Sequence, residues 1–102
     1  MRVRQPAKML RLHFSAGDKY GGKALYEAIA ERCLALSIAG MTVLRGTEVF
    51  KDDEPVVVTV IDSDENITTL MQAITPMLDT AVAAISDVEM IRIQSRLIQS
   101  NL

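Results

Sequence analysis

Two-residue alternation of apolar and polar positions predicts strands near both ends of this chain. Residues 8–15 place apolar side chains at positions 10, 12 and 14, and residues 88–94 alternate in the same way. A period of two is typical of a strand with one buried face. Two further segments, 41–50 and 56–61, are rich in residues that favour strands. Residues 56–61 are apolar on both faces, so both faces of the predicted sheet need cover.

Helical spacing first appears between residues 23 and 39, where Leu25, Ile29 and Cys33 fall on one side of a predicted helix. Gly40 follows directly. Glycine reaches the left-handed backbone conformation that ends many helices without a steric cost. We therefore expect Gly40 to end the first helix.

A second helix is predicted to begin at residues 62–65, whose side-chain oxygens can cap free amides and whose negative charge suits the helix dipole. Its apolar stripe continues as far as Ile85. Pro76 interrupts this stripe, because proline removes an amide donor and crowds the carbonyl one turn earlier. We expect a kink near Gln72 or a helix that restarts at Thr75.

The predicted order of elements is β-α-β-β-α-β, in which each half is a βαβ unit with a right-handed crossover. This is the ferredoxin-like α+β fold, with a four-stranded antiparallel sheet and two helices on one face. A chain of 102 residues has the size of one such domain. We expect a flexible N-terminal segment over residues 1–7, a single domain over 8–94 and a C-terminal tail over 95–102.

Composition and charge narrow the classes of function. The chain is 49% hydrophobic and 24% charged, as in ordinary globular proteins. A net charge of −2 and the absence of tryptophan argue against nucleic-acid binding. A single cysteine allows no intramolecular disulfide, and no apolar run approaches the ~20 residues of a membrane-spanning helix. We expect a cytoplasmic protein that associates with copies of itself to cover its second sheet face.

The strongest local feature is a glycine-bearing loop at residues 17–22, between the first strand and the first helix. Glycines before a helix can let free amides approach a phosphate. The spacing matches neither the Walker A pattern nor Gly-x-Gly-x-x-Gly. On the residues alone, a loop that only turns the chain is the more ordinary interpretation.

The sequence offers little that would support catalysis or metal binding. His13 is the only histidine, whereas a catalytic site needs several converging groups, and an interface role suits His13 equally well. Cys33 falls on the apolar side of the first helix, where an inert buried thiol is usual. The adjacent carboxylates of residues 52–54 are typical of a solvated turn. We predict neither an enzyme nor a metal site, and an enzyme that uses His13 is the last-ranked alternative.

Two segments have the most specific motifs of the chain, Asp18-Lys19-Tyr20-Gly21-Gly22-Lys23-Ala24-Leu25-Tyr26 and Thr42-Val43-Leu44-Arg45-Gly46. With the residues around them, from about Lys8 to Ile93, they resemble the family catalogued as domain of unknown function 190. That family is similar to the PII signalling proteins. The resemblance implies a ferredoxin-like trimer with adenine-nucleotide sites in the clefts between subunits. It also implies regulation of a partner, often a membrane transporter, with no cofactor and no chemistry of its own.

The resemblance also points to ligand-binding residues. Arg45, Gly46 and Thr47 lie where the second strand of the family ends and its effector loop begins, and there the backbone of PII-like proteins approaches the nucleotide. A glycine allows such an approach, and an arginine can bind a phosphate through two hydrogen bonds. The alternative is a strand bulge with a solvated Arg45.

Arg92 is the fourth residue implicated by the resemblance, because it matches the family pattern Val-Glu-Val-Ile-Arg on the last strand. The resemblance implies that Arg92 reaches the same cleft. A structural salt bridge with Glu48 or Glu89 is the alternative role.

Two departures from the family pattern limit what the resemblance implies. Only residues 51–55 separate the second and third strands, where the family carries a long effector loop. Residues 85–88 lack the glycine and lysine of the PII phosphate loop, which favours a nucleotide with fewer phosphates or another small anion. The alternative function is a structural or protein-interaction module without a small-molecule ligand.

Overall fold

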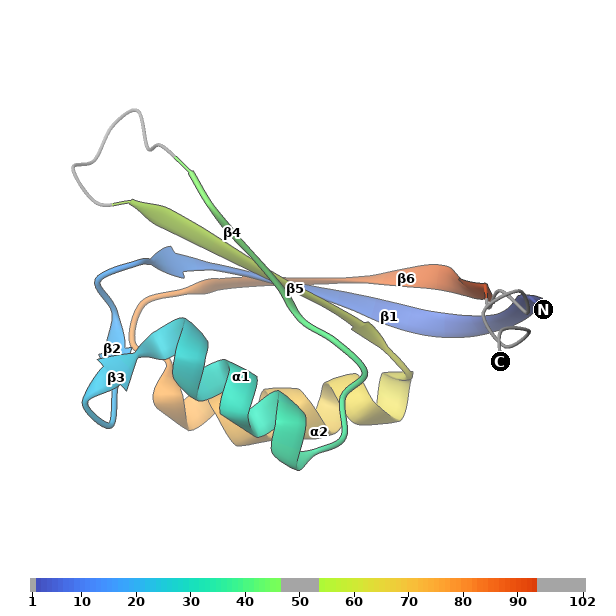
Figure 1. Cartoon of the computed structure of the whole chain (residues 1–102), viewed down its shortest axis with the longest axis horizontal. Coiled ribbons are helices and arrows are strands. Elements are labelled where there is room, and N and C mark those ends of the chain that lie inside the picture. The colour runs from blue at the N-terminus through green and yellow to red at the C-terminus, as the bar shows by residue number, and fades with distance from the viewer. Residues whose placement is uncertain (1, 47–53, 94–102) are drawn as a thin grey trace, which may run out of the picture.

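The computed structural model describes residues 2–46 and 54–93, and it contains one four-stranded sheet in the order β4-β5-β1-β6 (Figure 1). The strands of this sheet are β1 (Arg2–Ser15), β4 (Thr42–Arg45), β5 (Pro55–Asp62) and β6 (Val82–Ile93). The helices are α1 (Leu25–Ala35) and α2 (Asp64–Ile74), followed by the short 3-10 helix η1 (Thr75–Met77). A separate small hairpin consists of β2 (Lys19–Tyr20) and β3 (Lys23–Ala24).

Neighbouring strands of the four-stranded sheet are antiparallel throughout, and both helices cover the same sheet face (Figure 1). With the small hairpin set aside, the order along the chain is β-α-β-β-α-β. The predicted ferredoxin-like α+β fold is therefore confirmed. Within the described residues, no helix is long and apolar enough to cross a membrane.

The core lies between the sheet and the two helices, and the alternation in β1 and β5 accounts for it. The inward-facing residues of the two strands lie side by side, as Leu10 with Val60, Leu12 with Val58 and Phe14 with Val56. Each of them is at most 7% exposed, and Ile29, Ile67, Leu70 and Ile74 of the helices pack in the same cluster. Burying one such aliphatic side chain is worth about 1.5–3 kcal/mol. This layer is therefore the main source of stability.

Helix α1 ends before the residue that the sequence predicted. Ser37, and not Gly40, adopts the left-handed conformation, with φ 58°. The amides of Ser37 and Ile38 donate to the carbonyls of Leu34 at 3.1 Å and of Cys33 at 2.9 Å, which is the Schellman pattern of a helix end. Ile38 is 7% exposed, so its burial fixes the end of the helix upstream of Gly40.

Helix α2 begins at the predicted capping residues. The hydroxyl of Ser63 accepts a hydrogen bond from the amide of Asn66 at 3.1 Å. The carboxylate of Asp62 accepts from the amides of Ser63 at 2.7 Å and Ala39 at 3.3 Å, and from the side-chain nitrogen of Asn66 at 2.9 Å. Burial alone would raise the pKa of Asp62, but these hydrogen bonds and the charge of Arg92 outweigh burial and lower it.

The end of α2 confirms the predicted break at Pro76 and corrects the prediction for the residues beyond it. Helix α2 stops at Ile74, and η1 begins at Thr75 with the proline in its first turn. Pro76 has no amide to donate to the turn before it, so the hydrogen bonding changes there. The predicted continuation of the apolar stripe to Ile85 is wrong, because Ile85 lies in β6 and is 51% exposed.

The strands β1 and β6 are both longer than predicted. Residues 2–7 belong to β1 and pair with β6, whereas the sequence indicated a flexible segment there. Strand β5 stops opposite Lys8, so residues 2–7 pair with β6 alone, and Pro6 is tolerated in such an edge segment. Lys8 of β1 forms an ion pair with Asp87, its neighbour on β6. The tail predicted for residues 95–102 lies outside the described residues.

Candidate functional site

The structure places Arg45 and Gly46, two of the predicted ligand-binding residues, at one end of the sheet. Arg45 is the last residue of β4, and the amide of Gly46 donates to the carbonyl of Pro55 at 3.0 Å. Arg45 lies opposite Val56 at the start of β5. Thr47, the third predicted residue of this group, lies outside the described residues.

The side chain of Arg45 has two contacts, and both leave it accessible. Its Nε atom lies 3.2 Å from Oε1 of Glu54, with the two side chains 50% and 46% exposed. Its guanidinium lies over the ring of Tyr26 on α1, 5.7 Å from the ring centroid. An exposed ion pair is worth about 0–1 kcal/mol and an exposed cation–π contact about 0.5–1 kcal/mol. These contacts orient Arg45 without committing it to a structural role.

Nothing in the described part of the chain requires glycine at position 46. Its φ is not positive, in contrast to those of Gly21 and Gly22. A Cβ atom built there would meet Cγ of Pro55 at 3.7 Å, which is ordinary van der Waals contact. The described residues therefore show no close approach of backbone at Gly46, and its predicted approach to a ligand stays a prediction.

Arg92 lies far from Arg45 in a single chain. Arg45 is level with Phe14 of β1 through Val56, whereas Arg92 lies opposite Val3. Positions 3 and 14 of an extended strand are about 36 Å apart at ~3.3 Å per residue. The two arginines also lie on opposite edge strands, β4 and β6. One chain does not bring them together.

The alternative role predicted for Arg92 also changes. Glu89, one of its two expected partners, forms an ion pair with Arg4 at 2.6 Å instead. Glu48, the other, lies outside the described residues. Arg92 is exposed on β6, and its charge contributes to the lowered pKa of Asp62.

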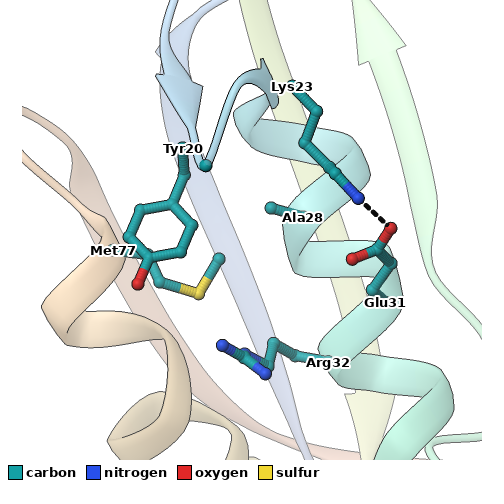
Figure 2. Close-up of a pocket in the computed structure, with 7 residues that line it drawn as sticks. Tyr20, Lys23, Ala28, Glu31, Arg32 and Met77 are labelled. Carbon is teal, nitrogen blue, oxygen red and sulfur yellow. Dashed lines mark hydrogen bonds and ion pairs between the residues drawn. The ribbon is translucent and has the colours of Figure 1, made fainter.

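Sequence reasoning missed a hollow of about 230 Å³ in the helix layer, between the small hairpin, α1 and η1 (Figure 2). Its lining includes Tyr20, Lys23 and Arg32. The glycine-bearing loop predicted at residues 17–22 forms a tight hairpin turn, because Gly21 and Gly22 both have positive φ, 61° and 82°. Two glycines between short extended segments are the usual signal of such a two-residue turn. That signal predicts the hairpin but not the hollow behind it.

The two residues considered for catalysis have different surroundings. His13 is exposed on β1, and its neighbours Leu12 and Phe14 point into the core, so His13 faces away from the helices. Cys33 is 4% exposed, and burial, together with the charge of Asp62, raises the pKa of its thiol. A buried thiol with a raised pKa is a poor nucleophile. Within the described residues, no group of three potential metal ligands comes together.

Comparison with solved structures shows that this fold is PII-like. The apo form of CPII, a nitrogen regulatory PII-like protein from Thiomonas intermedia K12, matches with a TM-score of 0.71 and 15% identity, over 91% of this chain and 100% of that chain. CPII bound to ADP, AMP and bicarbonate matches with a TM-score of 0.66 and 15% identity, over 90% and 100% of the two chains. A structure described as a PII-like signaling protein (TTHA0516), from Thermus thermophilus, matches at 0.67 and 14%, over 85% and 90%.

The family follows from the sequence match. The model of the domain of unknown function 190 family, described as an uncharacterized ACR, matches residues 7–90. The chain therefore belongs to this family, as its motifs predicted. The match includes the small hairpin, both helices, β4 and β5, and most of β6.

Proposed function

We propose that this chain is a cytoplasmic PII-like regulatory protein that forms a homotrimer, binds an adenine nucleotide or a similar small anion between subunits, and regulates a partner protein. The observation that carries the proposal is the likeness of the whole fold to CPII, a PII-like protein whose structures include complexes with ADP and AMP. The family resemblance adds a membrane transporter as the kind of partner to test. The protein acts by binding and not by catalysis.

The uncovered sheet supports association between copies. Leu44, Ile61 and Val82 are 60%, 41% and 65% exposed, and each alternates with inward-facing neighbours, so these side chains lie on the face away from the helices. Strand β6 is an edge strand that is exposed along most of its length. Such edges are normally paired or covered in native proteins. Closed symmetric association of identical chains is the usual way to cover them.

The placement of the two arginines supports a ligand site between subunits. The side chain of Arg45 is 50% exposed, so it is accessible to a second molecule. Arg92 is about 36 Å away along the strands of the same chain. If both arginines contact one ligand, Arg45 therefore comes from one subunit and Arg92 from its neighbour. This arrangement joins the predicted oligomer and the predicted site in one hypothesis.

The proposal is tested by thermal unfolding with AMP, ADP, ATP and inorganic phosphate, with the oligomer size measured by light scattering. A ligand that binds the folded state alone raises its stability by about 2.7 kcal/mol at a hundredfold excess over its dissociation constant. We expect one adenine nucleotide to give a saturable rise in Tm that Arg45→Ala weakens. Lys19→Ala is the control, because it removes an exposed positive charge from the small hairpin, outside the residues of the proposed site.

If no nucleotide changes the Tm of the intact oligomer, the nucleotide proposal is refuted. The exposed apolar positions Leu44, Ile61 and Val82 would then favour the second candidate, a protein-interaction module whose sheet face assembles complexes. A monomer of the intact chain would refute the trimer and with it the shared site.

A further inference from the structure

The hollow in the helix layer carries a positive charge that the proposed nucleotide site does not use. The ammonium of Lys23 lies 2.5 Å from the carboxylate of Glu31, so these two charges offset each other. Arg32 also lines the hollow, and among the described residues it takes part in no ion pair. With one negative and two positive side chains in the lining, one positive charge is left over.

The free charge points into the hollow. Figure 2 shows the guanidinium of Arg32 directed toward Tyr20 and Met77, whereas the Lys23–Glu31 pair lies on the other side of Ala28. A guanidinium is a planar fork that matches a carboxylate with two parallel hydrogen bonds. The hollow therefore presents a carboxylate-binding group on a side where no carboxylate of the described chain is paired with it.

The remaining walls suit an apolar body attached to that carboxylate. Ala28 and Met77 are each 6% exposed, so the packed core fixes these two walls in place. Tyr20 is 40% exposed and is presented by the tight β2–β3 turn at Gly21 and Gly22. A ring or a branched apolar group can pack against the tyrosine ring and the thioether without rearranging the backbone.

The size of the hollow restricts the ligand further. Pockets for drug-sized ligands measure about 300–1,000 Å³, and this hollow measures about 230 Å³. The hollow can take up a small organic acid, whereas a nucleotide would extend beyond it. Its lining is also separate from Arg45 and Gly46.

We propose that this hollow is a second ligand site, which takes a small monocarboxylate with an apolar, ring-sized body. The carboxylate binds the guanidinium of Arg32, and the body packs between Tyr20 and Met77. The Lys23–Glu31 pair borders the site and sets its net charge. This inference does not depend on the proposed nucleotide site.

The test is a titration of the full-length ¹⁵N-labelled protein with benzoate, followed by NMR at neutral pH. Benzamide, which has the same shape without the charge, is the control ligand. We expect saturable shifts of the Gly21 and Arg32 amides with benzoate and much weaker ones with benzamide. Arg32→Ala should weaken benzoate binding about tenfold or more, because a hydrogen bond to a charged group is lost. Lys19→Ala, in the same hairpin but outside the lining, should leave binding nearly unchanged.

A gain of affinity provides the second arm of the test. Glu31→Gln removes the one negative charge of the lining and frees Lys23, so benzoate should bind about threefold or more tightly. Damage to the fold cannot produce tighter binding, and the spectrum itself reports whether each variant is folded. Three results would overturn the proposal: no saturable shift at Gly21 and Arg32, equal shifts with benzamide, or equal weakening by Arg32→Ala and Lys19→Ala.

Discussion

Mixing two variants that bind nucleotide weakly tests whether the nucleotide site is formed by residues of two subunits. Arg45 and Arg92 lie about 36 Å apart in one chain, far beyond the reach of two side chains toward one small ligand. Arg45→Ala and Arg92→Ala should each weaken binding of the responsive nucleotide about tenfold or more, because each loses a charged hydrogen-bond donor. Arg45→Ala should remain folded, because its contacts with Glu54 and Tyr26 are exposed.

The two variants are then refolded together in equal amounts, so that their subunits assort at random. A site between two subunits is intact when one contributes a normal Arg45 and the other a normal Arg92, which applies to about a quarter of the sites in a closed ring. Isothermal titration should therefore recover about a quarter of the wild-type binding capacity at wild-type affinity. A mixture that binds no better than the two pure variants would refute the shared site. Recovery in a mixture whose subunits have not exchanged would refute it equally.

The remaining predictions concern stability. Ser37→Gly should raise the unfolding free energy by about 1 kcal/mol in a thermal scan, because the left-handed conformation is unfavourable for a residue other than glycine. Gly40→Ala should not lower Tm in the same thermal scan, because the site has open space and no positive φ. A lower Tm for Gly40→Ala would instead indicate that Gly40 ends the helix. Leu12→Ala, at a fully buried position, should cost about 2–5 kcal/mol in urea unfolding, and a cost near zero would contradict the described core. Asp62→Asn should lower stability at neutral pH. Because folding lowers the pKa of Asp62, its contribution is present above the unfolded-state pKa of about 3.9 and is lost as the pH falls through the folded value. The difference in unfolding free energy between wild type and Asp62→Asn should therefore become small at acid pH. A difference that does not change with pH would contradict the assigned hydrogen bonds.

Local signals in the sequence were sufficient for much of the fold. The alternation through Leu10 and Leu12 predicted the buried face of β1. The cap at Ser63 located the start of α2, and Pro76 located the break that follows it. Each of these signals acts within one turn or one strand, where nearest neighbours decide the conformation.

The errors concern positions where distant parts of the chain decide the outcome. Ser37 is left-handed because Ile38 must enter the core, and local propensity would have favoured Gly40. Residues 2–7 are a strand because β6 lies beside them, and Ile85 belongs to that strand instead of a helix. The alternation of residues 88–94 predicts a strand, but it does not indicate which distant segment pairs with that strand.

Of the candidate site, only the residues named by the family resemblance were predictable from the sequence. Arg45 and Gly46 were located at the end of a strand, as expected, but the distance to Arg92 depends on strand register and length. The hollow beside Arg32 depends on how the small hairpin packs across α1 and η1. Neither arrangement has a counterpart in residue spacing along the chain.

Asp62 joins the two halves of the fold at their seam. One of its oxygens holds the amide of Ala39, which leads out of α1, and the other holds the amide of Ser63, which leads into α2. The connection that closes the first βαβ half and the one that opens the second therefore share a single carboxylate. Opening of either connection breaks the hydrogen bond between the amide of Ala39 and Asp62, so this bond couples the ends of the two helices here. The two similar halves of the fold are therefore linked at this point by a side chain as well as by the sheet.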